Sequence, residues 1–160
     1  MFLTLHAATG AFLGEFAPNG LVAFAFGFLS HFVLDMFPHG DRGIAEQTKQ
    51  SGETRRYFWI LSIDSFVAVA IFFPAFALNL FERPVLAYWG LLGGLLPDLI
   101  VAIPEYALYV KQEYRVHLEW FYRLHTHMHD NVIRRWDSMS LKVGIVMQIV
   151  LLIIIWRLVR

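Results

Sequence analysis

The residues of this chain that can do chemistry are histidines and aspartates spaced one helical turn apart. One group is the segment SHFVLDMFPHGD, which holds His31, Asp35, His39 and Asp41, and the other is HTHMHD, which begins at His125. Because residues four apart share a helix face, His31 and Asp35 form a pair of an imidazole and a carboxylate. Such a pair can bind a divalent metal, or one member can bind while the other orients it. The alternative is a buried His–Asp hydrogen bond that only fixes helix packing.

These polar groups stand in a chain that is otherwise apolar. Of its 160 residues 58% are hydrophobic and 16% are charged, and the mean hydropathy is +0.53. Soluble domains carry about 25% charged residues. A charge at bilayer depth costs roughly 2.5–3.5 kcal/mol even on lenient insertion scales, so such residues pair, line a polar cavity or hold a metal. The composition therefore predicts a membrane protein built around a polar site.

Composition also excludes several classes of function. The formal net charge is zero, which argues against nucleic acid as a partner, since phosphate binding needs a basic surplus. The chain has no cysteine, so a metal must be bound by His, Asp or Glu rather than by thiolates. The N-terminus carries His6 and Glu15 and lacks a basic segment, so we expect it to belong to the mature protein rather than to a signal peptide.

Two carboxylates in the second half of the chain are candidate catalytic groups. Asp98 follows the sequence GGLLP, where we expect a transmembrane helix to be broken. Broken helices at membrane depth are tolerated when they are buried or line a cavity, so a carboxylate there is also a candidate metal ligand. The alternative is that Asp98 only caps the helix that starts after Pro97. Glu105, after Pro104, is a candidate general base.

The remaining candidates are histidines. His125 and His129 share a helical face, His117 falls near the same face, and His127 points elsewhere. A histidine-rich stretch of this kind can also be plain surface. His6 lies in an apolar helix that gives it little other reason to be polar, so it is a further candidate ligand.

The complete set of candidate metal ligands is His6, His31, Asp35, His39, Asp98, His125 and His129, with Asp98 and Glu105 as candidate catalytic residues. Histidine and carboxylate without thiolate suit a divalent metal, with zinc or manganese preferred and iron also compatible. A metal with an open position activates a water molecule for attack on an ester or phosphoester. One metal needs fewer ligands than this set offers, so either two metals bind or several of these groups orient the others.

The elements that must position these residues are all helical. We expect, in chain order, short apolar helices over 2–16 and 21–37, a polar loop over 38–56, a span over 57–81, a turn over 82–84, a span over 85–103, an interfacial aromatic helix over 105–142 and a final span over 143–159. Pro18, Asn19 and Gly20 separate the first two helices. Asp64, inside the first span, is a weaker candidate ligand, and the alternative is that it pairs with an arginine or with Ser62 and Ser65. The prediction is one all-α domain over residues 1–160, a multi-pass transmembrane helical bundle with a short N-terminal helical hairpin and an interfacial helix.

The basic residues predict how this bundle is oriented. Ten of the 13 lysines and arginines fall within 38–56 and 105–142, which the two central spans place on one side. By the positive-inside rule that side is cytoplasmic. We therefore expect a multi-pass protein of the plasma (inner) membrane, with the lipid bilayer as its partner and a polar site that opens to the cytoplasm. The sequence carries no indication of an oligomeric state.

Three short motifs resemble one known family. LSHFVLDMFPHGD resembles the His-x-x-x-Asp signature of the YdjM-like membrane-bound, metal-dependent hydrolases, GGLLPDLI resembles their Gly-x-Leu-x-Pro-Asp-x-Asp segment, and TLHAATG looks like their N-terminal histidine segment. The resemblance implies a multi-pass helical membrane protein with metal-dependent hydrolase activity. On that pattern the metal-site residues are His6, His31, Asp35 and Asp98. The chain departs from it in having Ile100 at the second aspartate, in the order of the two main motifs, and in having a histidine-rich run over 125–129 where the family has His-Arg and His-Ser pairs.

The leading hypothesis is thus a membrane-embedded metal-dependent hydrolase that acts on a lipid-like or amphiphilic ester or phosphoester through a metal-activated water. One alternative is a di-iron membrane oxidase or hydroxylase, which shares histidines four apart such as His125 and His129. Another is a non-enzymatic membrane protein, either a metal or proton transporter or a structural protein whose polar residues pair internally. The lack of an obvious nucleophile motif supports this last class.

Overall fold

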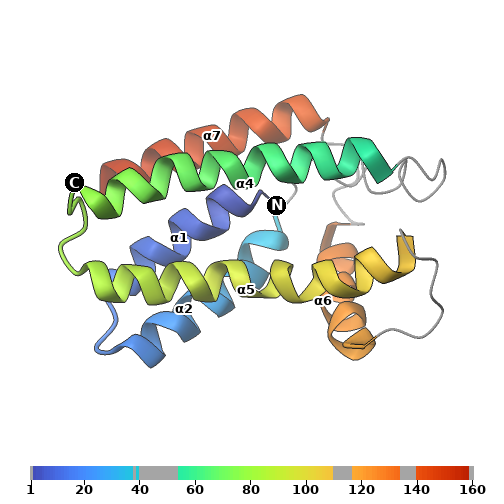
Figure 1. The fold of residues 1–160 in the computed structure, drawn as a ribbon, viewed down its shortest axis with the longest axis horizontal. Coiled ribbons are helices and arrows are strands. Elements are labelled where there is room, and N and C mark those ends of the chain that lie inside the picture. Colours follow the sequence, from blue (N-terminus) through green and yellow to red (C-terminus); the bar gives the residue numbers. More distant parts are fainter. Residues whose placement is uncertain (1, 38, 40–53, 110–116, 134–139, 159–160) are drawn as a thin grey trace.

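The computed structural model describes residues 2–37, 39, 54–109, 117–133 and 140–158. Within these residues the chain forms helices and no strands: α1 (Leu3–Glu15), α2 (Gly20–Asp35), α4 (Thr54–Ala77), α5 (Pro84–Tyr109), α6 (Glu119–Ile133) and α7 (Leu141–Leu158) (Figure 1). Three segments are long and apolar enough to cross a membrane, namely Trp59–Ala77, Pro84–Ala107 and Leu141–Leu158. The predicted all-α fold with membrane-span helices is therefore confirmed.

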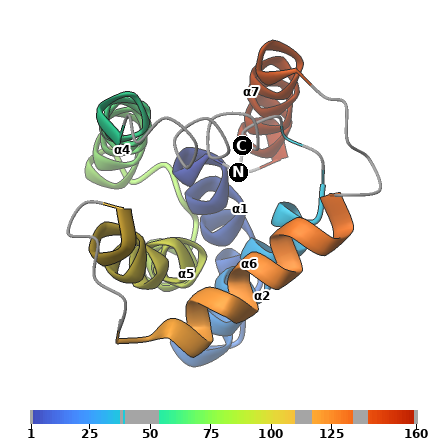
Figure 2. The same cartoon turned by 90° about the vertical axis from the view of Figure 1, so that its right-hand side faces the viewer.

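The first two helices form the predicted hairpin, which packs along α5 (Figure 1). The side chain of Asn19 caps α2, because its Oδ1 accepts a hydrogen bond of 3.0 Å from the amide of Val22. The helix ends at Asp35, two residues earlier than predicted. Both helices are shorter than a span, and α1 lies in the centre of the bundle, surrounded by α2, α4, α5 and α7 (Figure 2).

Since α1 begins inside the bundle, its first amide groups need partners from other helices. The carboxylate of Asp64 on α4 accepts from the amides of Leu3 and Thr4 and, at 2.6 Å, from the Thr4 hydroxyl. The side-chain oxygen of Gln148 on α7 accepts from the amide of Phe2 at 2.8 Å. Asp64 thus caps a helix, where we expected a partner arginine or serine, and the Ser65 hydroxyl donates instead to the carbonyl of Leu61.

Glycines allow α5 to approach both helices of the hairpin with its backbone. A Cβ atom built on Gly27 of α2 would lie 1.9 Å from the carbonyl oxygen of Gly90, and one on Gly93 would lie 2.1 Å from the carbonyl oxygen of Phe24. A Cβ atom built on Gly10 of α1 would likewise lie 2.3 Å from the carbonyl oxygen of Gly90. Contacts this close exist only without side chains, and close backbone approach is a common basis of helix association in membranes. They hold the hairpin and α5 in a fixed relative position.

The predicted break before Asp98 is wrong. Helix α5 continues from Pro84 to Tyr109, with Pro97 and Pro104 inside it. Proline in a helix removes a backbone hydrogen bond and costs roughly 3 kcal/mol, but tertiary packing can offset that cost. Here both prolines are fully buried and the glycine contacts with α1 and α2 precede the first of them. Asp98 therefore lies within a helix and does not cap one.

Other boundaries also differ from the expected ones. Helix α4 ends at Ala77 rather than at residue 81, and the region predicted as one interfacial helix contains the end of α5 and a separate helix, α6. Figures 1 and 2 show α6 lying across the end of the bundle, at a steep angle to α5. The same end holds the beginnings of α4 and α7 and the end of α5 (Figure 1).

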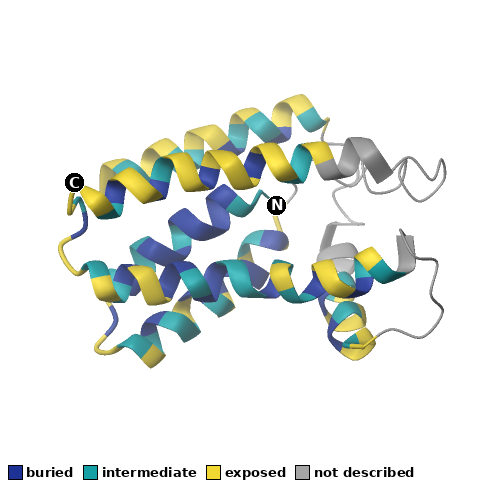
Figure 3. Ribbon diagram, in the orientation of Figure 1, coloured by how far each residue is buried: buried dark blue, intermediate teal, exposed yellow. Residues whose placement is uncertain are grey.

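The outer helices expose apolar rather than polar side chains. Figure 3 shows α1 largely buried, whereas α4 and α7 are mostly exposed along their length. Phe66 and Phe73 of α4 and Ile153 of α7 are among the large apolar side chains that face outward. Outward-facing apolar side chains along the whole length of a helix are unusual in soluble monomers and typical of helices that face lipid.

Candidate metal centre

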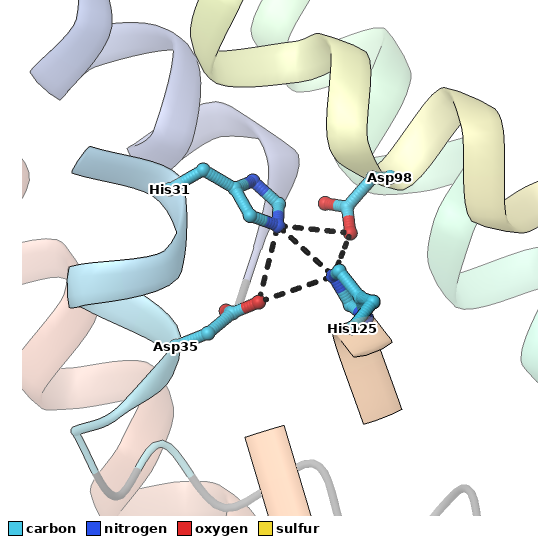
Figure 4. A group of neighbouring side chains, drawn as sticks. All are labelled: His31, Asp35, Asp98 and His125. Carbon is cyan, nitrogen blue, oxygen red and sulfur yellow. Dashed lines mark hydrogen bonds and ion pairs between the residues drawn. The ribbon is translucent and has the colours of Figure 1, made fainter. Parts of the chain in front are cut away.

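Four ionisable side chains from three helices meet at the end of the bundle near α6 (Figure 4). His31 and Asp35 come from α2, Asp98 from α5 and His125 from α6, and one ligand atom of each lies within 4.8 Å of all the others. We call these four residues the quartet. The side chains of His31 and Asp35 are 0% and 3% exposed, whereas that of Asp98 is 26% exposed. The α2 side of the quartet is therefore closed to solvent, whereas solvent can reach the quartet from the side of Asp98.

The distances within the quartet match the edges of a metal coordination shell. His31 Nε2 lies 3.0 Å from His125 Nε2, 3.1 Å from Asp35 Oδ2 and 3.6 Å from Asp98 Oδ1. His125 Nε2 lies 3.5 Å from Asp35 Oδ2 and 3.6 Å from Asp98 Oδ1. Ligands bound tetrahedrally at about 2.0–2.2 Å from a metal lie about 3.3–3.6 Å from each other. The four side chains can thus hold one divalent ion with only small movements.

The other nitrogen of His31 determines where its ring proton lies. His31 Nδ1 is 3.0 Å from the backbone carbonyl oxygen of Gly94, which can only accept a hydrogen bond. Nδ1 therefore carries a proton, and in the neutral ring Nε2 presents its lone pair to the oxygens of Asp35 and Asp98. That lone pair can accept a hydrogen bond from His125 Nε2, 3.0 Å away, or bind a metal ion that also neutralises the two carboxylates. A metal-binding histidine whose second nitrogen donates to a backbone carbonyl has this same arrangement.

The charges of the quartet also favour a cation. Two carboxylates face two imidazoles, so the group carries two negative charges when both rings are neutral. Buried charges without compensation are costly, and leaving one uncompensated costs several kcal/mol. A divalent ion neutralises both carboxylates. The alternative expected from the sequence, an internal His–Asp ion pair, requires a doubly protonated His31 in the same position.

Packing of α6 brings His125 into this group. Phe121, one turn before His125, is buried against Phe32 of α2 and Val101 of α5. Trp120 and Leu124, on a neighbouring face of α6, are exposed. Apolar contacts at helical spacing thus dock the helix, and His125 follows on the same buried face.

The other predicted site residues lie in different places. His6 is next to the quartet, with its Nε2 atom 3.1 Å from Asp35 Oδ1. His39 is buried outside the quartet; its Nδ1 atom is 2.6 Å from the carbonyl oxygen of Phe37, and its own carbonyl accepts from Gln148 of α7. Glu105 is two turns beyond Asp98 on α5 and partly buried, so its role as a base stays a prediction.

Several other predicted residues lie outside the described residues or at exposed positions. The side chain of His129 and residue Asp41 lie outside the described residues. His117 and His127 are exposed. Sequence reasoning missed the carbonyl of Gly94, which contacts His31, and the helix-capping role of Asp64. The contact between His31 and the Gly94 carbonyl could have been suspected from the pair Gly93 and Gly94, because paired glycines mark places where backbones approach closely.

The expected convergence of His31, Asp35 and Asp98 is present, and His125 completes the group. Comparison of the chain with protein-family models, with curated proteins and with solved structures found no match in any of the three. The resemblance to the YdjM-like hydrolases therefore stays a prediction, and function has to be argued from the quartet.

Proposed function

We propose that this protein is a membrane-embedded hydrolase that depends on one divalent metal bound by His31, Asp35, Asp98 and His125. The observation that carries the proposal is the orientation of His31. Because its Nδ1 proton is directed at the Gly94 carbonyl, its Nε2 lone pair faces into the quartet, toward carboxylate oxygens at 3.1 and 3.6 Å and His125 Nε2 at 3.0 Å, and this arrangement supports a bound cation.

The uneven exposure of the quartet supports a reactive rather than a closed site. Structural zinc sites are enclosed by four protein ligands, whereas catalytic sites keep a position open. Asp98 is 26% exposed and His125 is 11% exposed at the side chain, so the shell can be approached from their side. A divalent ion held there would supply the activation of a water molecule and the polarisation of an ester or phosphoryl oxygen. Glu105, two turns further along α5, would be the general base that takes the proton of that water through a bridging water.

The surroundings support a substrate with an apolar part. Leu99 and Ile103, on the same stretch of α5 as Asp98, are 56% and 55% exposed, and Trp120 and Leu124 expose apolar surface on α6. We therefore assign the substrate to amphiphilic esters or phosphoesters such as lipids. We also propose that the protein is a multi-pass protein of the plasma membrane with α6 and the quartet at the cytoplasmic face, which the distribution of lysines and arginines supports.

Metal content of detergent-purified protein is the first test. We expect about one divalent ion per chain, with zinc or manganese favouring the hydrolase and iron favouring an oxidase. Asp98→Asn should lose most of the metal. Glu15→Gln is the matched control, because Glu15 binds the backbone amide of Arg83 at the opposite end of α1. Folded wild-type protein that binds no metal would contradict the proposal and favour an internal ion pair.

Activity is the second test. Wild-type protein loaded with metal should hydrolyse an acyl ester or phosphodiester carrying a long alkyl chain, and chelation should abolish the reaction. Re-addition of the metal should restore it, and Glu105→Gln should slow it without loss of metal. Stoichiometric metal without hydrolysis of either substrate class would identify the quartet as a structural or transport site.

A further inference from the structure

We propose that His6 is a positioning residue that orients Asp35 and is not itself a metal ligand. This inference rests on the proposed metal site and deepens it. It departs from the assignment that the family resemblance implies, in which His6 belongs to the ligand set.

The two oxygens of Asp35 face different partners. Oδ2 faces the quartet, at 3.1 Å from His31 Nε2 and 3.5 Å from His125 Nε2. Oδ1 faces away from it, at 3.1 Å from His6 Nε2. The carboxylate thus offers one oxygen to a metal in the quartet, and His6 holds the other.

The surroundings of His6 determine which of its nitrogens carries the proton. Both nitrogens are buried and neither makes a hydrogen bond of ideal geometry among the described residues, but Nε2 has a carboxylate oxygen within reach, Asp35 Oδ1 at 3.1 Å. A buried N–H group without an acceptor is costly, so the proton lies on Nε2. A protonated nitrogen cannot bind a metal. His6 therefore has the tautomer opposite to that of His31, whose Nε2 is free because its Nδ1 faces the Gly94 carbonyl.

His6 is also held rigidly, as a positioning residue must be. Its ring is fully buried and stacks on that of His31, with centroids 4.0 Å apart and planes 26° apart. Its backbone belongs to the first turn of α1, which Asp64 anchors through Thr4. A Cβ built on Gly94 would lie 2.5 Å from the His6 carbonyl oxygen, so α5 leaves this turn no room to shift.

A direct test compares two substitutions of His6 by cobalt(II) titration of the detergent-solubilised full chain. His6→Leu removes the donor, whereas His6→Gln keeps an N–H near the position of Nε2 but offers a poor metal ligand. Loss of a group that orients a ligand typically costs 10- to 100-fold in metal affinity. We expect a loss of about that size in His6→Leu, with most of it restored in His6→Gln. Thr9→Val, one turn further along α1, is the control and should leave the affinity unchanged.

The visible spectrum of bound cobalt separates positioning from ligation. Cobalt d–d bands report the number and type of ligands, so a positioning role predicts the wild-type spectrum and one ion per chain in both saturated variants. A changed spectrum, a drop from two bound ions to one, or equal losses in Gln and Leu variants would overturn the inference and make His6 a ligand. Unchanged affinity in His6→Leu would also overturn it. If wild-type protein binds no cobalt, the proposed metal site itself fails.

Discussion

Replacement of Gly27 by alanine tests whether the contact between α2 and α5 sets the geometry of the quartet. Gly27 is one turn before His31 on α2, and its Cα faces the carbonyl of Gly90. In an ordinary helix interior, alanine in place of glycine stabilises by roughly 1 kcal/mol. At this position we expect the opposite sign, because an added Cβ has no space.

The size of the effect follows from the distances. The added Cβ would lie 1.9 Å from the Gly90 oxygen and 2.8 Å from the Gly94 nitrogen, so α2 must move outward by more than 1 Å for the contact to reach 3.0 Å. Overpacking of this kind costs typically about 1–3 kcal/mol. The same movement lengthens the 3.0 Å contact of His31 with Gly94 beyond hydrogen-bonding distance. Metal–ligand distances tolerate only about 0.2 Å, so metal affinity should fall as well.

Thermal unfolding of the metal-free protein in detergent measures the first effect, and metal titration measures the second. Gly20→Ala is the matched control, since its Cβ meets the side chain of Trp89 rather than backbone and lies at the far end of α2. We expect Gly27→Ala to melt at a lower temperature than both wild type and this control, and to bind metal at least 10-fold more weakly. A Gly27→Ala protein as stable as wild type with unchanged metal affinity would refute the packing argument.

Four further predictions follow from the same contacts. Asp64→Leu removes the cap of α1 and should destabilise by about 1–2 kcal/mol in thermal unfolding, whereas Ser65→Ala should stay within about 0.5 kcal/mol of wild type. Asp35→Asn should abolish metal binding while the apo protein keeps its stability; a loss of roughly 3–5 kcal/mol in the apo protein would instead indicate a structural ion pair. Metal at 100 times its dissociation constant should raise the stability by about 2.7 kcal/mol, and chelation should remove that gain. Single cysteines at His117 and Glu82, in a chain without native cysteine, should label from opposite sides of the membrane, and labelling from one side would contradict the proposed topology.

Most of the helices, and the placement of His31 and Asp35 on one helix face, could be predicted from the sequence because they depend on local pattern. Apolar runs interrupted by Pro18, Asn19 and Gly20 predict the hairpin, and three longer runs predict the spans. Placing His31 and Asp35 on one face needs only the helical repeat. Where the helix depended on its neighbours, local reasoning was wrong: α5 continues through Pro97 because α1 and α2 pack against the preceding turns.

Which side chains meet was decided only by the tertiary structure. The sequence by itself determined that this is an all-helical chain with apolar spans and with histidine, aspartate and glutamate as its available metal ligands. Docking of α6 through Phe121 selected His125, and His39 was turned toward the Phe37 carbonyl instead. The Gly94 carbonyl and the Asp35 oxygens set opposite tautomers in His31 and His6. Such outcomes depend on contacts between residues far apart in the sequence; His31 and Gly94, for example, are 63 positions apart. Local sequence patterns carry no information on which distant residues come into contact.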